Sequence, residues 1–341
     1  MRIAVDAMGS DRAPHVEVHG AILASMATRV EVLLVGDEQE LAPALAAYRK
    51  RHKVSIIHAP EVIAMTDPPV EAVREKKDAS VLVALRLAKD RKVDGVVSAG
   101  NTGAVMVGAR VILGPIRGVA RSAICQQLPT LEKPVLLLDL GANVDCTVRH
   151  LCEFAEMGMV YSQRTLGVEN PRVGLINIGE EQAKGNDVAK KVHRLLQAFE
   201  HVNFVGNVEP RALYTGVADV VVCDGFVGNL VLKTSEAVAS LIATRLKQQL
   251  RSTWLSKVGA LFSMGAFRRL RHTIDPNAYS GAPLLGVNGT VIVCHGAASS
   301  RGIANAIHGA CRAVKTGVNE HIREGIRELR EAEALLKQGT P

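Results

Sequence analysis

Short runs of β-branched residues recur along the chain and alternate with stretches that have the spacing of an amphipathic helix. Two clear helical stretches are Ala79–Ala88 and Asp187–Phe199. The strand-like runs are Ile3–Val5, Val32–Val35, Val54–Ile57, Val93–Val97, Val135–Leu138, Val173–Ile176, Val202–Val205, Val220–Val222 and Val291–Val293. Because strand alternating with helix is typical of wound sheets, the pattern predicts an α/β protein with a mostly parallel sheet.

Composition agrees with this fold class. Aromatic residues make up 3% of the 341 residues, and Val, Ile, Leu, Ala and the 30 Gly fill the core instead. Parallel sheets under helices use aliphatic side chains in this way, whereas few aromatics disfavour a stacking platform for single-stranded nucleic acid. No linker, repeat or low-complexity tract divides the sequence, so residues 1–341 are predicted to form a single α/β domain.

Neither a signal peptide nor a membrane span is predicted. Asp6 stands too early for the apolar core of a signal peptide. The longest uncharged stretch, Pro276 to Ser300, is interrupted by Gly, Pro, Asn and Ser and is predicted to hold loops and one buried strand. Residues Val314 to Leu336 have the spacing of an amphipathic helix, whose core-facing positions are Ile322, Ile326, Leu329 and Leu336.

Six of the predicted strands end in glycine together with Asn, Asp, Ser or His. These ends are Ser98–Ala104, Asp139–Asn143, Asn177–Glu180, Gly206–Glu209, Asp224–Asn229 and His295–Gly296. Each could be an ordinary turn, since Gly, Asn and Asp dominate turns. Parallel strands carry ligand sites at their carboxyl ends, so the six together favour a binding site along one edge of the sheet.

Several catalytic and cofactor motifs are missing from the sequence. It contains no GxxxxGK[ST], no GxGxxG, no GxSxG and no HExxH. His, Cys and carboxylates do not cluster at metal-ligand spacing, and none of the six cysteines forms a CxxC pair. We therefore expect no metal and no redox or nucleotide cofactor, and we expect the cysteines to be reduced thiols that behave as buried hydrophobes.

Two single residues are candidates for chemistry. Lys184 follows a strand end, where its ammonium group could neutralise phosphate or stabilise a developing oxyanion. An ion pair with Glu180, four residues earlier, explains the same lysine without any catalysis. His295 ends an apolar strand and could transfer a proton, or it could be a structural, hydrogen-bonded histidine.

A series of motifs, in order along the chain, closely resembles those of the bacterial phosphate acyltransferases of phospholipid synthesis. The resemblance extends to about residue 315 and rests on Asp6–Asp11 with Pro14, Ser98–Ala104, Asp139–Asn143, Asn177–Glu181 with Lys184 and Gly185, Gly206–Glu209, Asp224–Asn229, and Gly281–Gly286 with His295 and Gly296. The sequence departs from the family pattern at Ser122, where Pro is expected, and at Ala297, where Ser is usual. The second departure removes a hydroxyl to which a role would otherwise be assigned.

The resemblance implies transfer of an acyl group from acyl-[acyl carrier protein] to inorganic phosphate. It also implies an α/β/α sandwich similar to isocitrate dehydrogenase and phosphotransacetylase, a homodimer, no cofactor, and a glycerol-3-phosphate acyltransferase that consumes the acyl phosphate. The residues alone leave two other classes open. A dehydrogenase of the isocitrate type lacks its expected carboxylate cluster here, and a regulatory or nucleic-acid-binding protein would leave the polar strand ends unexplained.

The resemblance and the strand-end positions together suggest roles for individual residues. Lys184 is expected to stabilise charge, and Asn229, with the backbone N–H groups of Gly225–Gly228, is expected to bind the oxyanion or phosphate. His295 is expected to orient the substrate or protonate the leaving thiolate. Further substrate-binding candidates are Asn101, Thr102, Asn143, Asn177, Asp224, Gly225 and Gly228.

Residues 237–274 contain seven basic and no acidic residues, which equals the whole formal net charge of +7. With its flanks this segment, 235–275, is predicted to be an inserted helical hairpin with a break near Ser252. Its tip carries Trp254, Leu261, Phe262 and Phe267. An apolar face rimmed by Arg and Lys suits shallow insertion into an anionic bilayer, so we expect a cytoplasmic enzyme at the inner face of the cell membrane. Alternatively, the Val238–Leu250 face packs in a dimer interface, or the basic residues dock the acidic carrier protein.

Overall fold

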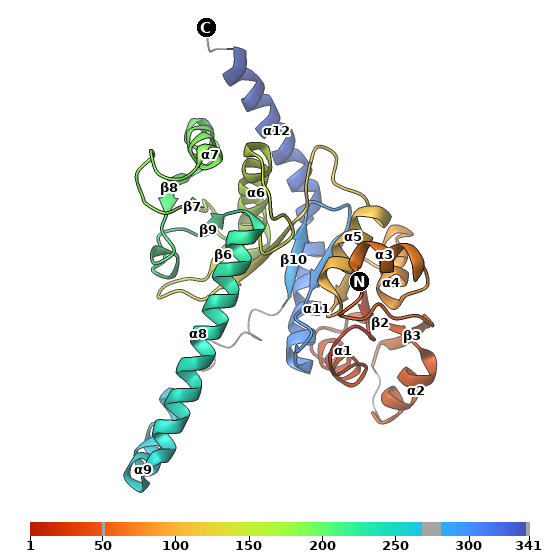
Figure 1. The fold of residues 1–341 in the computed structure, drawn as a ribbon. Helices are drawn as coiled ribbons and strands as arrows, with labels where there is room; N and C mark the ends of the chain where they lie inside the picture. Colours follow the sequence, from red (N-terminus) through yellow and green to blue (C-terminus); the bar gives the residue numbers. More distant parts are fainter. Residues whose placement is uncertain (50–51, 268–280, 339–341) are drawn as a thin grey trace.

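One twisted sheet runs through the whole molecule (Figure 1). The computed structural model describes residues 1–49, 52–267 and 281–338. In the described part the strand order is β3-β2-β1-β4-β11-β10-β5-β6-β9-β7-β8. The strands are β1 (Arg2–Asp6), β2 (Glu31–Gly36), β3 (Val54–His58), β4 (Gly95–Ser98), β5 (Ala123–Leu128), β6 (Val135–Leu138), β7 (Val173–Ile176), β8 (Phe204–Val208), β9 (Val220–Val222), β10 (Ala282–Leu285) and β11 (Thr290–Val293).

The sheet consists of two parallel blocks that run in opposite directions. The first block is β3-β2-β1-β4-β11, and the second is β6-β9-β7-β8. Between them, three successive antiparallel pairings join β11 to β10, β10 to β5, and β5 to β6. An odd number of reversals places the carboxyl ends of the two blocks at opposite edges. The prediction of a single edge carrying all six polar strand ends is therefore wrong.

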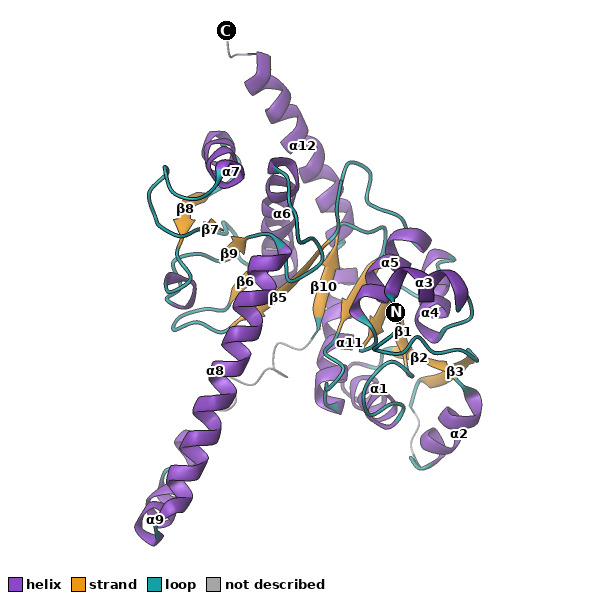
Figure 2. Ribbon diagram, viewed as in Figure 1, coloured by secondary structure: helices purple, strands orange, loops and turns teal. Residues whose placement is uncertain are grey.

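Helices cover both faces, so the fold is the predicted α/β/α sandwich (Figure 2). Apolar side chains of α1 (His15–Thr28), α11 (Ser300–Lys315), α6 (Val148–Tyr161), α7 (Asp187–Ala198) and α12 (Val318–Gln338) pack on one face. On the other face lie α3 (Pro69–Glu75), α4 (Ser80–Lys89), α5 (Thr102–Ile112) and the start of α8 (Gly225–Ser252). The short α2 (Glu38–Ala46) lies beside β3 at the sheet's end.

The two middle strands are the part that the sequence pattern does not predict. β5 contains the polar residues Gln126 and Gln127, and the four-residue β10 contains Pro283, so neither has the composition of a buried strand. The stretch Pro276 to Ser300 holds two strands, β10 and β11, rather than one; residues 276–280 lie outside the described part. The missed strands are the ones that reverse the sheet.

The C-terminal helix also differs from its prediction. Gly317, at φ +59°, separates α11 from α12, so the helix begins at Val318 rather than Val314. Ile322, Ile326 and Leu329 are buried as expected, whereas Leu336 is 36% exposed because α12 extends beyond the body at that point (Figure 1).

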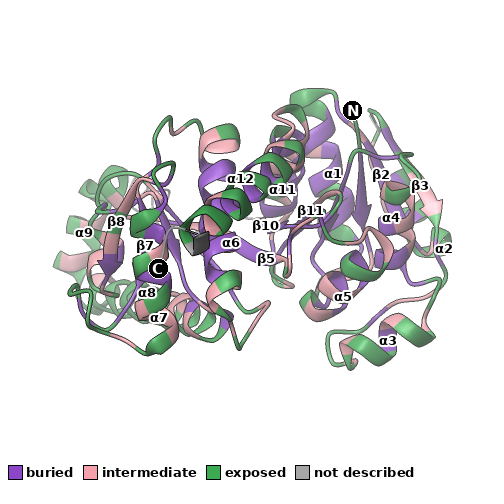
Figure 3. Cartoon of the chain, turned by 90° about the horizontal axis from the view of Figure 1, so that it is seen from above, coloured by how far each residue is buried: buried purple, intermediate pink, exposed green. Residues whose placement is uncertain are grey.

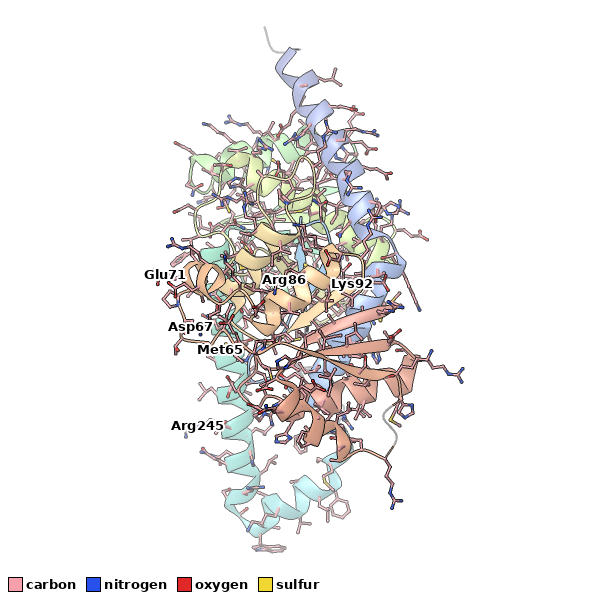
Figure 4. The ribbon with its side chains drawn as sticks, turned by 90° about the vertical axis from the view of Figure 1, so that its right-hand side faces the viewer. Met65, Asp67, Glu71, Arg86, Lys92 and Arg245 are labelled. Atoms are coloured by element: carbon pink, nitrogen blue, oxygen red, sulfur yellow. The ribbon has the colours of Figure 1, made fainter. Side chains whose placement is uncertain are left out.

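The predicted helical hairpin leaves the body as the outer half of α8 and the helix α9 (Trp254–Phe262). The break lies where expected: α8 ends at Ser252, and the Thr253 hydroxyl caps α9 by accepting a hydrogen bond from the Ser256 N–H at 3.1 Å. We call residues 237–267 the arm. Its side chains are almost all exposed (Figure 3), and Arg245 points away from α8 into open space (Figure 4). Residues 268–275 lie outside the described part.

By length and composition alone, α8 could cross a membrane. Its first turns, however, belong to the protein core, because Val227, Val231 and Leu232 pack against the buried cluster between the sheet and α4–α5. Only the outer half of α8 projects from the body (Figure 1).

Candidate functional site

At the first block's carboxyl edge, a buried carboxyl group organises the ends of β1 and β4. Asp6 accepts hydrogen bonds from the hydroxyls of Ser80 and Ser98, each at 2.6 Å. Burial raises the pKa of Asp6, while these two hydrogen bonds act in the opposite direction. The backbones approach so closely that a Cβ on Gly9 would lie 2.6 Å from the Cα of Gly100. The loops after β1 and β4 therefore pack as one unit.

Asn101, predicted to bind phosphate, uses its side chain inside the protein. Its Oδ1 accepts a hydrogen bond from the backbone of α5, and its Nδ2 donates to three carbonyls of loop 64–67 at 3.0–3.3 Å. Two residues of that loop, Met65 and Asp67, are labelled in Figure 4. The Asn101 amide therefore positions loop 64–67. Thr102 is exposed on the first turn of α5, and in the described part no hydrogen bond occupies its hydroxyl.

His295 lies at the same edge, two residues beyond β11. It is exposed, and its Nδ1 accepts a hydrogen bond from the Ala297 N–H at 3.1 Å, which leaves the proton of a neutral ring on Nε2. The Arg12 guanidinium ties the neighbouring loops together by donating to the carbonyls of Ala297 and Ala298 at 3.4 and 3.0 Å. His295 thus offers a free N–H at the first edge.

Glu17, on α1 beneath these loops, is a group that the sequence patterns do not single out. It is 0% exposed, and neither carboxyl oxygen has a hydrogen-bond partner. Burial is the main cause of a pKa raised to about 7; the nearby Ser10 hydroxyl and the Arg12 charge oppose the rise, and Asp6 adds to it. In the sequence, the only signal for Glu17 is a charged residue on an otherwise apolar helix face.

At the second block's carboxyl edge, Asp139 is the organising residue. It is 0% exposed and accepts hydrogen bonds from the N–H groups of Ile124, Ala142 and Asn143 at 2.6–3.2 Å. The Asn143 amide donates to Asp139 and to the Ser122 carbonyl at 2.9 and 2.8 Å. Both hydrogens of that amide are therefore engaged within the protein, and burial raises the pKa of Asp139.

The start of α8 packs directly on this loop. Asp224 caps the helix by accepting a hydrogen bond from the Val227 N–H at 2.8 Å. A side chain at Gly228 would overlap the carbonyl oxygen of Asp139, so only glycine fits there. Asn229 follows on the exposed side, where its side chain lies next to Gly141, and no hydrogen bond occupies its amide within the described residues.

Lys184 lies beside this cluster in the turn 177–186, which joins β7 to α7. The Asn177 Nδ2 donates to the Lys184 carbonyl at 3.2 Å, which shapes the turn. The turn is not helical, and no ion pair joins Lys184 to Glu180 or to another carboxylate in the part of the chain that the structure describes. The helical ion-pair interpretation therefore fails, and the Lys184 ammonium group stays available.

Three helices begin around this second edge and present their positive ends to it. They are α6, α7 and α8, whose N-caps are Thr147, Asn186 and Asp224. Helix N-termini favour negative charge. Together with Lys184, they make this edge suitable for an anion.

The cysteines next to this edge are not activated. Burial raises the pKa of Cys146 to about 12 and that of Cys223 well above its ordinary value, and Asp139 adds to both shifts. Because the thiolate is the reactive form, neither thiol is prepared for nucleophilic attack. All six cysteines are free, as predicted. Among the described residues, no three His, Cys, Asp or Glu side chains gather as metal ligands would.

The candidate residues therefore divide into two groups. Lys184, Asn229, Asn143, Asn177, Asp224, Gly225 and Gly228 lie at the second edge, whereas His295, Asn101 and Thr102 lie at the first. Asp6 holds the loops of the first edge in place, and Asp139 holds those of the second edge. The sequence patterns assigned no role to either carboxyl group. An Asp directly after an apolar run is the signal that could have found both.

The fold is that of the phosphotransacylases. The chain is similar to the EutD phosphotransacetylase from Staphylococcus aureus, with a TM-score of 0.59 and 15% identity over 93% of this chain and 94% of that one. A branched-chain phosphotransacylase from Enterococcus faecalis has a TM-score of 0.56 and 15% identity over 92% and 99%. These likenesses show the architecture.

Sequence similarity identifies the family. The model of the family described as "Fatty acid synthesis protein" matches residues 1–321, and the chain belongs to this family. A phosphate acyltransferase from Citrifermentans bemidjiense is 44% identical over 100% of this chain and 97% of its own length. A phosphate acyltransferase from Acidobacterium capsulatum is 46% identical over 94% and 95%. The chain is thus an acyltransferase enzyme of lipid biosynthesis, and the predicted family is confirmed.

Proposed function

We propose that this enzyme transfers the acyl group of acyl-[acyl carrier protein] to inorganic phosphate and releases acyl phosphate and free carrier protein. The observation that carries the proposal is the second edge, where an unpaired lysine and an unengaged amide lie among three helix N-termini. Two anionic reactants need such an environment, and a direct attack by phosphate needs no nucleophile from the enzyme. The protonated state of Cys146 and Cys223 is consistent with that.

Phosphate binding is assigned to Lys184 and to the Phe226 N–H in the first turn of α8. The ammonium group offsets the repulsion between phosphate and the thioester oxygen as negative charge grows there. Gly225 and Gly228 are buried and fix the helix start against loop 139–143. The N–H groups of Gly225, Val227 and Gly228 donate to the Asn143 carbonyl, the Asp224 carboxylate and the Asp224 carbonyl, so the expected anion site on all of these N–H groups is reduced to that of Phe226. Holding both reactants in place supplies a large share of the rate enhancement.

In the chemical step, a phosphate oxygen forms a bond to the thioester carbon, and the carbonyl π electrons move to oxygen. We assign the Asn229 amide to that oxyanion. Collapse of the tetrahedral intermediate then breaks the C–S bond, and the electron pair leaves with the carrier's thiolate. Asp224 and Asn177 hold the surrounding loops, and Asn143 shapes the floor beneath Asn229.

The leaving sulfur is bonded to the carbon attacked at the second edge, so His295 at the opposite edge is too far to protonate it and the thiolate takes its proton from solvent. His295 is assigned instead to orienting the bound carrier protein. Thr102, with an unoccupied hydroxyl at the same edge, is the accompanying substrate-binding residue.

We further propose that the arm attaches the enzyme to the inner face of the cytoplasmic membrane and that the enzyme is a homodimer. Trp254, Leu261 and Phe262 are 71%, 62% and 85% exposed, and basic residues lie between them and along α8. Such a surface suits anionic lipid.

The exposed Val238–Leu250 stripe of α8 is the surface assigned to the second copy. At the membrane, a glycerol-3-phosphate acyltransferase would receive the acyl phosphate. A carrier-protein dock is the alternative use of the arm's positive charge.

The proposed reaction is tested by measuring phosphate-dependent release of carrier thiol together with acyl phosphate formation. We expect both products in equal amounts, without added NAD or metal and without inhibition by a chelator. Thiol release that needs no phosphate would identify a thioesterase instead. Activity lost in chelator and restored by magnesium would favour a metal-dependent alternative.

A further inference from the structure

A cavity of about 590 Å³ lies at the second edge, and its lining includes Gly185 and Val227, which are one and two residues from Lys184 and Asn229 in the sequence. Its walls come from the loop after β6, the end of β7 with its turn, the first turn of α7 and the first turn of α8. Ligand pockets commonly have volumes of roughly 300–1,000 Å³. The apolar lining residues are Val144, Cys146, Leu151, Leu175, Ile176, Ile178, Val188, Ala189, Pro210, Cys223 and Val227.

The cavity is polar at one part of its rim and apolar at its floor. Asn177, whose amide donates to the Lys184 carbonyl, and Asp224, the N-cap of α8, belong to the rim. Leu151, Leu175 and Cys223 form the floor and are each less than 9% exposed. A ligand that fits this arrangement has a charged or polar head and a long apolar tail.

Two further side chains at the rim have no apolar neighbour to cover them. Ile178 is 81% exposed and Val144 is 60% exposed, although both line the cavity. Exposed aliphatic residues at a cavity entrance indicate that an apolar ligand continues past them. In the described chain, neither side chain packs in one of the buried clusters.

We propose that this cavity holds the hydrocarbon chain of the acyl substrate and that α7 sets the accepted chain length. The proposal rests on the proposed function. With the chain on the apolar floor, the thioester carbon lies at the rim, where Lys184 and Asn229 are available to phosphate. Ala189 and Val188, on the first turn of α7, project into the space and determine how much chain enters.

The experiment compares phosphate-dependent turnover of octanoyl and palmitoyl carrier protein by Ala189→Leu. Leucine at this position displaces several methylenes of a long chain, and each buried methylene contributes about fourfold to binding. We expect the ratio of kcat/KM for palmitoyl over octanoyl substrate to fall about tenfold or more. Ala198→Leu, an exposed position at the other end of the same helix, is the matched control and should leave the ratio unchanged.

Val188→Ala tests the proposal in the opposite direction and does not depend on the larger variant folding. It enlarges the cavity, so the same ratio should rise. A folded Ala189→Leu that slows both substrates equally, or a Val188→Ala with an unchanged ratio, would overturn the assignment of the cavity. A wild-type enzyme that forms no acyl phosphate from either carrier would overturn the proposed function itself.

Discussion

The two ends of α8 belong to one continuous helix, yet their surroundings have little in common. At the first turn, Gly225 and Gly228 are buried against loop 139–143, and a side chain at position 228 would overlap the Asp139 backbone. In the arm, Leu241 and Ile242 are 57% and 61% exposed. The same secondary structure therefore serves two purposes: a fixed helix start at the site and a projecting apolar surface.

Charge divides in the same way along this helix. Near the body, Lys233 pairs with Glu236 at 2.9 Å. Further out, Arg245, Lys247 and Arg251 have no carboxylate partner in the described part of the chain. These cations beside exposed apolar residues are the basis of the proposed attachment of the arm to an anionic membrane. We therefore propose catalysis at the inner end of α8 and membrane attachment at its outer end. Substitutions can test each proposal separately.

The largest effect is expected from Lys184→Ala at the inner end. Removing the only cation assigned to the phosphate should lower kcat by about 10³-fold, as for loss of a strong oxyanion donor. Lys184 is exposed and unpaired, so the thermal midpoint should not change. Steady-state acyl phosphate formation and a melting curve measure both. Lys191→Ala, an exposed lysine on α7, is the control; near-wild-type turnover by Lys184→Ala would remove Lys184 from the mechanism.

Asn229→Ala should have the next largest effect, at about 10²-fold on kcat with little change in KM for the acyl carrier protein. An amide that contacts the oxyanion acts mainly on the chemical step. Thr234→Ala, also exposed on α8, should be neutral. If KM rose while kcat stayed constant, Asn229 would be a docking residue.

Glu17→Gln tests the buried carboxyl group under the first edge. Its folded pKa, about 7, lies above the ordinary value of 4.5, so the folded state binds the proton more tightly. Stability should therefore fall as pH rises from about 4.5 to 7, and then level off. Integrated over this window, the loss is on the order of 3 kcal/mol. In Glu17→Gln, the urea midpoint should change less between pH 5 and 8 than it does in the wild type. A pH dependence equal to that of the wild type would mean that another group titrates.

The smallest effect on catalysis is expected at the outer end. The double variant Trp254→Glu/Leu261→Glu should keep wild-type kcat with soluble substrates, because the arm lies away from the site. The same variant should lose sedimentation with anionic vesicles, since two charges oppose burial of the apolar tip. Undiminished vesicle binding together with a weaker affinity for acyl carrier protein would identify the tip as a carrier dock.

The sequence predicts the elements of this fold better than their arrangement. All nine expected strands are present, and Val202–Val205 shows the largest shift, to Phe204–Val208. The alternation of apolar runs and helices carries that information locally. The direction of the second block depends on β5 and β10, whose polar or proline-containing sequences resemble loops, so a pattern of single elements could not reveal the reversal.

Part of the candidate site, like part of the fold, could be predicted from the sequence. Lys184 and Asn229 follow strands of the second block and lie free at its edge. Asn101, Asn143 and Asn177 were expected to bind substrate, but their amides hold loops together. Strand-end asparagines suit either use, because the same amide can donate to a ligand or to a nearby carbonyl. Only the contacts decide between these uses. The roles of Asp6, Asp139 and Glu17 follow from their burial in the structure.

The central claim is that the second edge, at the inner end of α8, binds the phosphate. A crystal structure of the full chain soaked in phosphate, with a sulfate soak as comparison, tests it most directly. The account predicts an anion within hydrogen-bond distance of the Lys184 Nζ and the Phe226 N–H in the first turn of α8. An anion bound instead at Thr102 and His295, with the second edge empty at the same concentration, would contradict it.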